Sequence, residues 1–292
     1  MPELPEVTAL VEELDRRTRG SVLAAADLAA ISVLKTFDPP LTACVGSTVG
    51  GVVRRGKFIC WELAEAFLVV HLARAGWLKW LDTVPANPAR PGRGPLMLRL
   101  VFANPDGEPL GRCDLTEAGT RKSGAVYVVR SLADVPGIAR LGPDPLAPSF
   151  TDADLAAVLS AAGRSQLKGV LRDQRKLAGI GNAYSDEILH AARLSPFKPA
   201  DSLDEAGVAA LLEQIRAVLG AALDSARQTP ITALKDGKRS NMRVHGRTGE
   251  SCPVCGDRVR EVAFADSSLQ YCPTCQTGGK PLADRRMSRL LK

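Results

Sequence analysis

The sequence predicts an α+β protein of several domains, with an N-terminal helix and a β-sandwich lobe followed by a helical domain and a zinc ribbon. Short apolar runs broken by Gly and Pro occupy residues 31–129, a pattern typical of antiparallel sheets. Apolar residues keep helical spacing further along, and two Cys-x-x-Cys pairs lie near the end of the 292-residue chain. This length suits more than one hydrophobic core. We expect a β-rich domain over 1–140, a linker over 141–148, a helical domain over 149–235 and a zinc-finger domain with a basic tail over 236–292.

The N-terminus leads directly into a predicted helix. The apolar positions that keep helical spacing after Pro5 are Val7, Leu10, Val11 and Leu14. Gly20 then indicates a helix end. The apolar runs that we expect to form strands are residues 58–63, 67–72, 96–102 and 125–129.

Helical signals dominate beyond the linker, where three prolines fall within residues 141–148. Thr151 followed by Asp154 predicts a helix start with an N-cap and an acid in the first turn. Apolar spacing then predicts three more helices, over 167–171, 183–192 and a longer one over 208–223.

The charge of the chain permits nucleic-acid binding and is also compatible with an ordinary solvated basic surface, because the formal net charge is +6 and the pI is about 9.0. The basic residues gather in two clusters that could follow a phosphate backbone, Lys235, Lys238, Arg239, Arg243 and Arg247, and Arg285, Arg286, Arg289 and Lys292. No apolar run of about 18 residues is present, so we expect no membrane span. Acids at the N-terminus oppose a secretion signal, so we expect a cytoplasmic protein.

Four of the seven cysteines form a predicted metal site: Cys252, Cys255, Cys272 and Cys275. Two Cys-x-x-Cys pairs separated by 16 residues are the pattern in which two tight turns present four thiolates to one zinc ion. The alternative is four unliganded thiols. Four sulfur ligands leave no position for a water, so the ion would be structural, with folding energy on the order of 10–16 kcal/mol.

Gly179 and Gly181 predict a tight turn between two helices. Free backbone amides at the start of the second helix, with the Asn182 side chain, could hold a phosphate. From the glycines alone, an ordinary helical hairpin is the alternative.

The segment around this turn resembles the helix-two-turns-helix element of the formamidopyrimidine-DNA glycosylase and endonuclease VIII family. The matching residues are Leu171, Asp173, Gln174, Ala178, Gly179, Gly181, Asn182, Tyr184, Asp186 and Glu187. The resemblance implies that Asn182 contacts the phosphates that flank a lesion. It also places Lys168 where the family commonly carries a lysine directed at the same backbone.

The first seven residues, MPELPEV, match the glycosylase branch of that family letter for letter. Removal of Met1 would leave the secondary amine of Pro2, which can attack the sugar C1′ and form an iminium as the base departs. The resemblance implies that Glu3 transfers protons and that Glu6 supports the site. Without the distant motifs, a solvated helix start with favourable charges is the alternative.

Two further residues follow the family pattern in the β-rich lobe. Lys57 matches a turn lysine that contacts DNA phosphate and assists elimination, and the alternative is a solvated charge. His71, with Leu72 and Gly76, is similar to the family's His-Leu-x-Met-Ser-Gly loop and is a candidate DNA contact. The alternative is a core histidine whose ring nitrogens form hydrogen bonds within the protein.

The chain departs from the family at the residues that fill the space vacated by an everted nucleotide. Arg74 and Ala75 stand in place of the methionine and serine, and Arg121 is the candidate replacement for an arginine in another loop. Ser267 stands where the family has an arginine implicated in δ-elimination, five residues before the third zinc cysteine. We therefore expect β-elimination, with δ-elimination only if Arg247 or the C-terminal arginines compensate.

The resemblance implies a monomeric base-excision repair enzyme, both DNA glycosylase and abasic-site lyase, acting on double-stranded DNA with damaged bases or abasic sites. Zinc is the expected cofactor. The alternatives are a lesion-binding protein with little base excision and, least favoured, a generic zinc-ribbon adaptor. Residues 229–244 look short for the loop that caps 8-oxoguanine in the glycosylase branch, so the sequence does not predict which lesion is removed.

Overall fold

The computed structural model describes residues 1–92, 94–119, 121–264 and 267–283. The basic C-terminal cluster lies outside the described residues. The chain divides into two compact units, the first formed by Met1–Leu141 and Ala226–Lys235, the second by Gly142–Ser225 and Asp236–Lys292. The second unit thus contains the zinc ribbon and most of the predicted helical region, whereas residues 226–235 of that region fall in the first unit.

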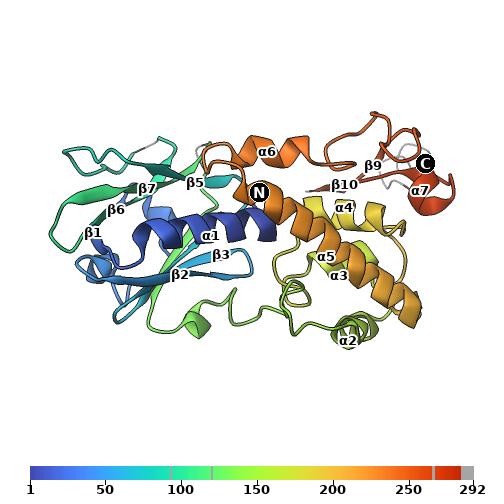
Figure 1. The fold of residues 1–292 in the computed structure, drawn as a ribbon, viewed down its shortest axis with the longest axis horizontal. Coiled ribbons are helices and arrows are strands. Elements are labelled where there is room, and N and C mark those ends of the chain that lie inside the picture. The colour runs from blue at the N-terminus through green and yellow to red at the C-terminus, as the bar shows by residue number, and fades with distance from the viewer. Residues whose placement is uncertain (93, 120, 265–266, 284–292) are drawn as a thin grey trace. The chain divides into compact units, whose positions relative to one another are not determined.

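The first unit combines one long helix, α1 (Leu4–Thr18), with two four-stranded antiparallel sheets (Figure 1). One sheet has the order β1 (Val22–Leu28), β6 (Leu96–Ala103), β7 (Pro109–Glu117), β5 (Gly76–Leu81). The other has the order β2 (Val49–Arg55), β3 (Phe58–Leu63), β4 (Phe67–His71), β8 (Ala125–Val129). The short 3-10 helices η1 (Ile31–Val33) and η2 (Leu41–Cys44) lie between β1 and β2, and η3 (Leu132–Asp134) follows β8. The β-rich lobe with an N-terminal helix is confirmed.

The apolar stripe of α1 explains its position against the second sheet. Leu4, Val7, Leu10 and Leu14 are almost completely buried, and α1 contacts β2 and β3. Pro5 lies in the first turn, where a missing N–H costs nothing because no intrahelical acceptor faces it. This packing fixes the residues that precede the helix at the protein interior.

The second unit is helical, with a small hairpin near its end. Its elements are α2 (Asp152–Ala162), α3 (Leu167–Arg172), α4 (Asn182–Ala191), η4 (Ala200–Ser202), most of α5 (Glu205–Arg227), most of α6 (Leu234–Ser240), β9 (Arg260–Ala263), β10 (Ser268–Tyr271) and α7 (Pro273–Thr277). The predicted cap is present, since Thr151 Oγ1 accepts the N–H of Asp154 at 3.3 Å. All four helices that the sequence predicts in this region are confirmed.

One described helix, α5, is long and apolar enough to cross a membrane by length and composition alone. Its residues Leu211, Ile215 and Leu219 are fully buried within the protein, whereas several of its alanines are exposed. Arg216 on the same helix donates to the carbonyl of Phe150. Buried apolar residues with interspersed charges are typical of an amphipathic core helix.

Candidate functional site

The residues that precede and open α1 form a buried acidic N-terminus. Pro2 is buried, and Glu3 and Glu6 are each only 2% exposed. The backbone N–H of Glu3 donates to Oε2 of Glu6 at 2.8 Å. Both carboxyl groups lie near the positive end of the helix dipole, which favours negative charge there. The structure thus brings Pro2, Glu3 and Glu6 together at one protected position.

Lys57 directly precedes β3 and His71 ends β4, so both lie at the same end of this strand pair of the second sheet. Lys57 follows Gly56 in the two-residue turn between β2 and β3, and the adjacent Phe58 is the register partner of His71 at the end of β4. The Phe58 and His71 ring centroids are 4.6 Å apart. Burial, and then the charge of Lys57, lower the pKa of His71 to about 4.

The hydrogen bond that His71 Nδ1 accepts determines which nitrogen of the neutral ring carries the proton. At neutral pH the ring is uncharged, and its Nδ1 accepts the backbone N–H of Ala73 at 3.3 Å. The proton of the neutral ring therefore lies on Nε2. This N–H is a donor that can serve an anionic oxygen close to the Lys57 ammonium.

Arg74 is exposed at the turn between β4 and β5. The turn is closed by the Gly76 N–H, which donates to the Leu72 carbonyl at 2.9 Å. A Cβ on residue 76 would lie 2.3 Å from that oxygen, so the turn requires glycine. The backbone thus presents the side chain that replaces the family methionine on a tightly closed loop.

Arg121 is exposed in the loop between β7 and β8. The carboxylate of Glu117 accepts the backbone N–H groups of Ser123 and Gly124 at 2.7 and 3.0 Å. Burial opposes ionisation of Glu117, but hydrogen bonds from the Ser123 hydroxyl and from these two N–H groups outweigh it and lower its pKa. Lys122 bonds the carbonyls of Glu117 and Gly119. Glu117 therefore organises the loop that carries Arg121.

In the second unit, the Gln174 side chain holds the turn between α3 and α4. Its Oε1 accepts the Gly179 N–H at 2.9 Å, and its Nε2 donates to the Ile180 carbonyl at 2.6 Å. Gly179 has φ +94°, which favours glycine.

Asn182 is the first residue of α4, and its Nδ2 donates to the Ser268 carbonyl at 2.8 Å. Within the described part of the chain, its buried Oδ1 has no hydrogen-bond partner.

Lys168 is buried, and its ammonium group faces the interior of the second unit. Its Nζ lies 2.6 Å from Oδ1 of Asp186 and 3.1 Å from the Asn182 carbonyl oxygen. The other Asp186 oxygen contacts Nδ1 of His245 at 2.8 Å. Lys168 and Asn182 therefore lie together, with Asp186 as the partner of the lysine.

Glu187 fixes the segment that leads to the zinc ribbon. Its carboxylate accepts the backbone N–H groups of Arg243, Val244 and His245 at 2.8, 2.9 and 2.8 Å. Arg247 follows this segment, and its Nη1 lies 2.8 Å from Glu250. Asp186 and Glu187 match the family motif in the sequence, but their hydrogen-bond partners are seen only in the structure. The available signal was two adjacent acids directly before the apolar residues Ile188 and Leu189.

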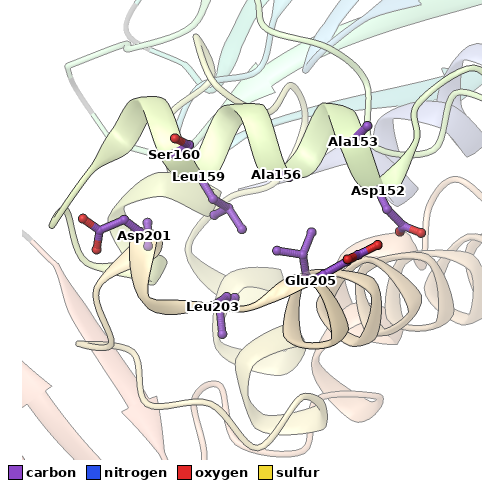
Figure 2. A pocket seen from close by; sticks show the side chains of 10 residues that line it. Asp152, Ala153, Ala156, Leu159, Ser160, Asp201, Leu203 and Glu205 are labelled. Carbon is purple, nitrogen blue, oxygen red and sulfur yellow. The ribbon is translucent and has the colours of Figure 1, made fainter.

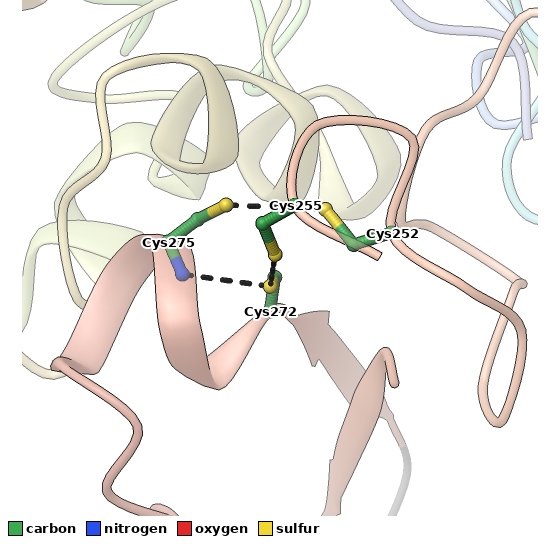
Figure 3. A group of neighbouring side chains, drawn as sticks. All are labelled: Cys252, Cys255, Cys272 and Cys275. Atoms are coloured by element: carbon green, nitrogen blue, oxygen red, sulfur yellow. Dashed lines mark hydrogen bonds between the residues drawn. The ribbon is translucent and has the colours of Figure 1, made fainter. Parts of the chain in front are cut away.

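The four predicted metal ligands converge near β10 and α7 (Figure 3). Their Sγ atoms all lie within 4.8 Å of one another. Tetrahedral zinc with Zn–S bonds of about 2.3 Å requires sulfurs roughly 3.8 Å apart, so the cluster fits one ion. Burial raises the pKa of Cys275 to about 11, and a divalent cation would offset that cost. Cys252, Cys255, Cys272 and Cys275 are thus positioned to bind one zinc ion.

A separate cavity of about 510 Å³ lies among α2, η4 and the start of α5 (Figure 2). Carboxylates of Asp152, Asp201 and Glu205 lie around it, and Leu159 and Leu203 contribute apolar surface. Its lining includes no predicted site residue. Three acids disfavour a phosphate backbone at this position.

The predicted site residues fall in both units. Ser267 lies between β9 and β10 of the second unit, together with Lys168, Asn182 and Arg247. The first unit holds the remaining candidates for catalysis and DNA contact, namely Pro2, Glu3, Glu6, Lys57, His71, Arg74 and Arg121.

Comparison with known proteins identifies three family domains along the chain. The formamidopyrimidine-DNA glycosylase N-terminal domain matches residues 1–126, and the H2TH domain of the same family matches residues 141–232. The zinc finger found in FPG and IleRS matches residues 249–278. The order of the three domains is the order of the motifs in the sequence.

Relatives and solved structures agree with these matches. The formamidopyrimidine-DNA glycosylase of Symbiobacterium thermophilum is 35% identical over 299 residues, covering 98% of this chain and 93% of that protein. An uncharacterised formamidopyrimidine-DNA glycosylase-like protein of Mycobacterium tuberculosis is 56% identical over 161 residues, 55% of this chain and all of that protein. The Lactococcus lactis enzyme, solved with DNA containing an abasic site, has a TM-score of 0.79 at 25% identity, covering 94% of this chain and 99% of that one. The chain therefore belongs to the formamidopyrimidine-DNA glycosylase family of DNA-repair enzymes.

Proposed function

We propose that this protein is a bifunctional DNA glycosylase and abasic-site lyase that acts as a monomer in the cytoplasm. Its partner is double-stranded DNA that contains a damaged, oxidised base or an abasic site. The observation that carries the proposal is the buried arrangement of Pro2, Glu3 and Glu6 at the start of α1. The Lactococcus lactis relative bound to abasic-site DNA supports the choice of partner.

The proposed reaction begins at the Pro2 amine after Met1 is removed. An α-amino group has a pKa of about 7.7–8.0, so a useful fraction is the free base at neutral pH. The nitrogen attacks C1′ as the bond to the damaged base breaks, and opening of the sugar gives an iminium. Loss of a C2′ proton then breaks the bond from C3′ to its phosphate oxygen, and hydrolysis of the iminium releases the enzyme.

The carboxylates and nearby cations support distinct parts of this reaction. Glu3 transfers protons to and from the opening sugar, and Glu6 holds Glu3 through its backbone N–H. Lys57 and the neutral His71 bind phosphate oxygens, because an ammonium group and a ring N–H are both donors at the same end of the second sheet.

The second unit binds the phosphate backbone of the DNA. Asn182, at the helix start, and Arg247 contact phosphates. Lys168 supports them by holding Asp186 and the Asn182 carbonyl.

Arg74 and Arg121, both exposed on closed loops of the first unit, fill the space that an everted nucleotide leaves. Zinc stabilises the ribbon and takes no part in the chemistry, because four thiolates complete its coordination.

The test is borohydride trapping on the zinc-loaded protein with duplexes that carry an abasic site, 8-oxoguanine, a formamidopyrimidine or an oxidised pyrimidine. We expect a reduced protein–DNA adduct that a peptide map locates at Pro2. A matched variant, Pro2→Glu, retains Met1 because the second residue is large, and it should bind DNA without forming the adduct.

The same experiment separates the proposal from its alternatives. An adduct with the abasic duplex alone would support the lyase and not base excision. Tight lesion binding with no adduct, from protein shown to have lost Met1, would contradict the catalytic proposal and favour a lesion-binding protein. The same DNA binding to all duplexes, unaffected by removal of the first residues, would favour a zinc-ribbon adaptor.

A further inference from the structure

His190 on α4 lies against the metal ligands, although it belongs to none of the sequence motifs. The side chain is in the last turn of α4 and is 2% exposed. Its Nε2 is 3.3 Å from the Sγ of Cys252, a contact between residues 62 positions apart. This residue is the point at which α4 touches the sulfur cluster directly.

The surroundings of His190 determine its tautomer. Its buried Nδ1 has no hydrogen-bond partner within the described residues. A buried N–H without an acceptor is rarer and more costly than an acceptor left unpaired. The proton therefore belongs on Nε2, where it points at sulfur.

The sulfur cluster needs such donors. Four thiolates on one Zn²⁺ carry two excess negative charges, and Cys252 and Cys272 are almost completely buried. The backbone N–H of Cys275 lies 3.5 Å from the Cys272 sulfur. His190 supplies the corresponding donor to the Cys252 sulfur. Hydrogen bonds from surrounding residues to the ligands stabilise a metal site and orient its ligands.

We propose that His190 is a positioning residue of the zinc site, whose Nε2–H donates to the Cys252 thiolate and fastens the end of α4 to the ribbon. Glu187, one turn earlier, binds the backbone of Arg243, Val244 and His245. Together the two side chains join the helix that begins at Asn182 to the metal-bound segment. Metal occupancy thereby controls how firmly α4 is held.

Two substitutions test the hydrogen bond. His190→Phe keeps a ring of similar size and removes the donor, whereas His190→Gln keeps an N–H. Loss of such an outer contact weakens metal binding by about 10–100-fold. We expect zinc transfer to a chelator to accelerate by that factor in His190→Phe and to return toward the original rate in His190→Gln. Cobalt(II)-substituted His190→Phe should show a shifted thiolate-to-cobalt absorption band.

A matched control separates metal positioning from general destabilisation. Leu189→Ala removes a neighbouring, fully buried side chain of α4, and it should lower stability while leaving the cobalt spectrum of the folded protein unchanged. If His190→Phe releases zinc at the unchanged rate with an unchanged cobalt spectrum, the proposal is wrong.

A second measurement uses the unaltered protein, in case His190→Phe does not fold. With ¹¹³Cd in the site, the His190 Nε2 proton should show a scalar coupling to cadmium through the sulfur, and nitrogen shifts should report the Nε2–H tautomer. A protonated Nδ1, or an Nε2 proton without coupling to cadmium, would overturn the proposal.

Discussion

The backbone N–H of Glu3 donates to the Glu6 carboxylate at 2.8 Å, and each of the two residues is only 2% exposed. Acidic residues at a helix start are ordinarily solvated, where they benefit from the helix dipole. Here the apolar face of α1 draws the first turn into the protein. The two acids are thereby held in fixed positions next to Pro2, as a reacting centre requires.

Substitution of Glu6 tests this arrangement. Glu6→Ala removes a charged acceptor from a buried N–H, so we expect a loss of about 1.5–3 kcal/mol in the free energy of unfolding. The control is Glu13→Ala on the same helix. Glu13 pairs with Arg16 and Arg17 at the surface, where an ion pair contributes about 1 kcal/mol or less. Urea unfolding measures the free energy of unfolding of both variants. Equal losses would contradict the larger stabilisation that we expect from the buried hydrogen bond to Glu6.

The pKa of His71 predicts a pH dependence of stability. Its pKa of about 4 in the folded protein is below the ordinary value of 6.5. As the pH falls, the unfolded chain takes up this proton first, so folding loses stability between pH 6.5 and 4, by roughly 3 kcal/mol in total. His71→Asn should remove this part of the slope.

Proton NMR can follow the titration directly, because the chain has only three histidines. The His71 ring signal should titrate below pH 5. A midpoint near 6.5 would show that the ring is solvated and that Lys57 does not act on it.

Local patterns predicted α1 to α5 and four of the strands. They did not predict α6 and α7, and the remaining strands depend on their neighbours. β2 contains Gly50 and Gly51, which weaken a strand signal. In β7, Arg112 and Asp114 interrupt the apolar pattern, yet they form ion pairs with each other and, through Asp114, with Arg99 of β6. Cross-strand pairing of this kind stabilises a sheet without leaving a periodic signal in one segment.

In the candidate site, too, motifs in the sequence identified residues, whereas their contacts are seen only in the folded chain. The motif identified Lys168, but its partner Asp186 lies 18 positions away on another helix. That pairing arises because α3 packs against α4. His190 carries no motif at all, and only the folded chain brings it to Cys252. Residue identities could be predicted from the sequence, and long-range hydrogen bonds could not.

The turn that presents Arg74 gives a third prediction. Gly76→Ala would place a Cβ 2.3 Å from the Leu72 carbonyl oxygen, so the backbone must shift, at a cost of about 1–3 kcal/mol. As a control, Gly169→Ala in α3 meets nothing within 4 Å and should gain about 0.5–1 kcal/mol from helix propensity. Thermal unfolding of both variants checks the opposite signs. Gly76→Ala with unchanged stability would contradict the turn geometry.

The hydrogen bonds from residues 243–245 to the Glu187 carboxylate give a fourth prediction. Glu187→Ala leaves three backbone N–H groups without their acceptor, of which only that of Val244 lies in a fully buried contact, and a buried donor left unsatisfied costs about 1–3 kcal/mol. We expect a loss of about 1–3 kcal/mol in the free energy of unfolding, with faster hydrogen exchange at residues 243–245. Glu250→Ala, which removes only an exposed contact with Arg247, should leave that exchange unchanged. Slow exchange in Glu187→Ala would show that other groups hold the segment.

Arg74 and Arg121 give the last prediction, which concerns base excision. Both side chains are exposed, so Arg74→Ala and Arg121→Ala should change stability by no more than about 0.5 kcal/mol. Stacking of a side chain on bases contributes about 1–3 kcal/mol, so each variant should excise a damaged base about 5- to 150-fold more slowly. Nicking at an abasic site should fall less, because no base has to leave the stack. Arg130→Ala, an exposed arginine of the same unit that pairs with Asp38, is the control. Excision at the unaltered rate in both variants would show that another part of the chain fills the vacated space.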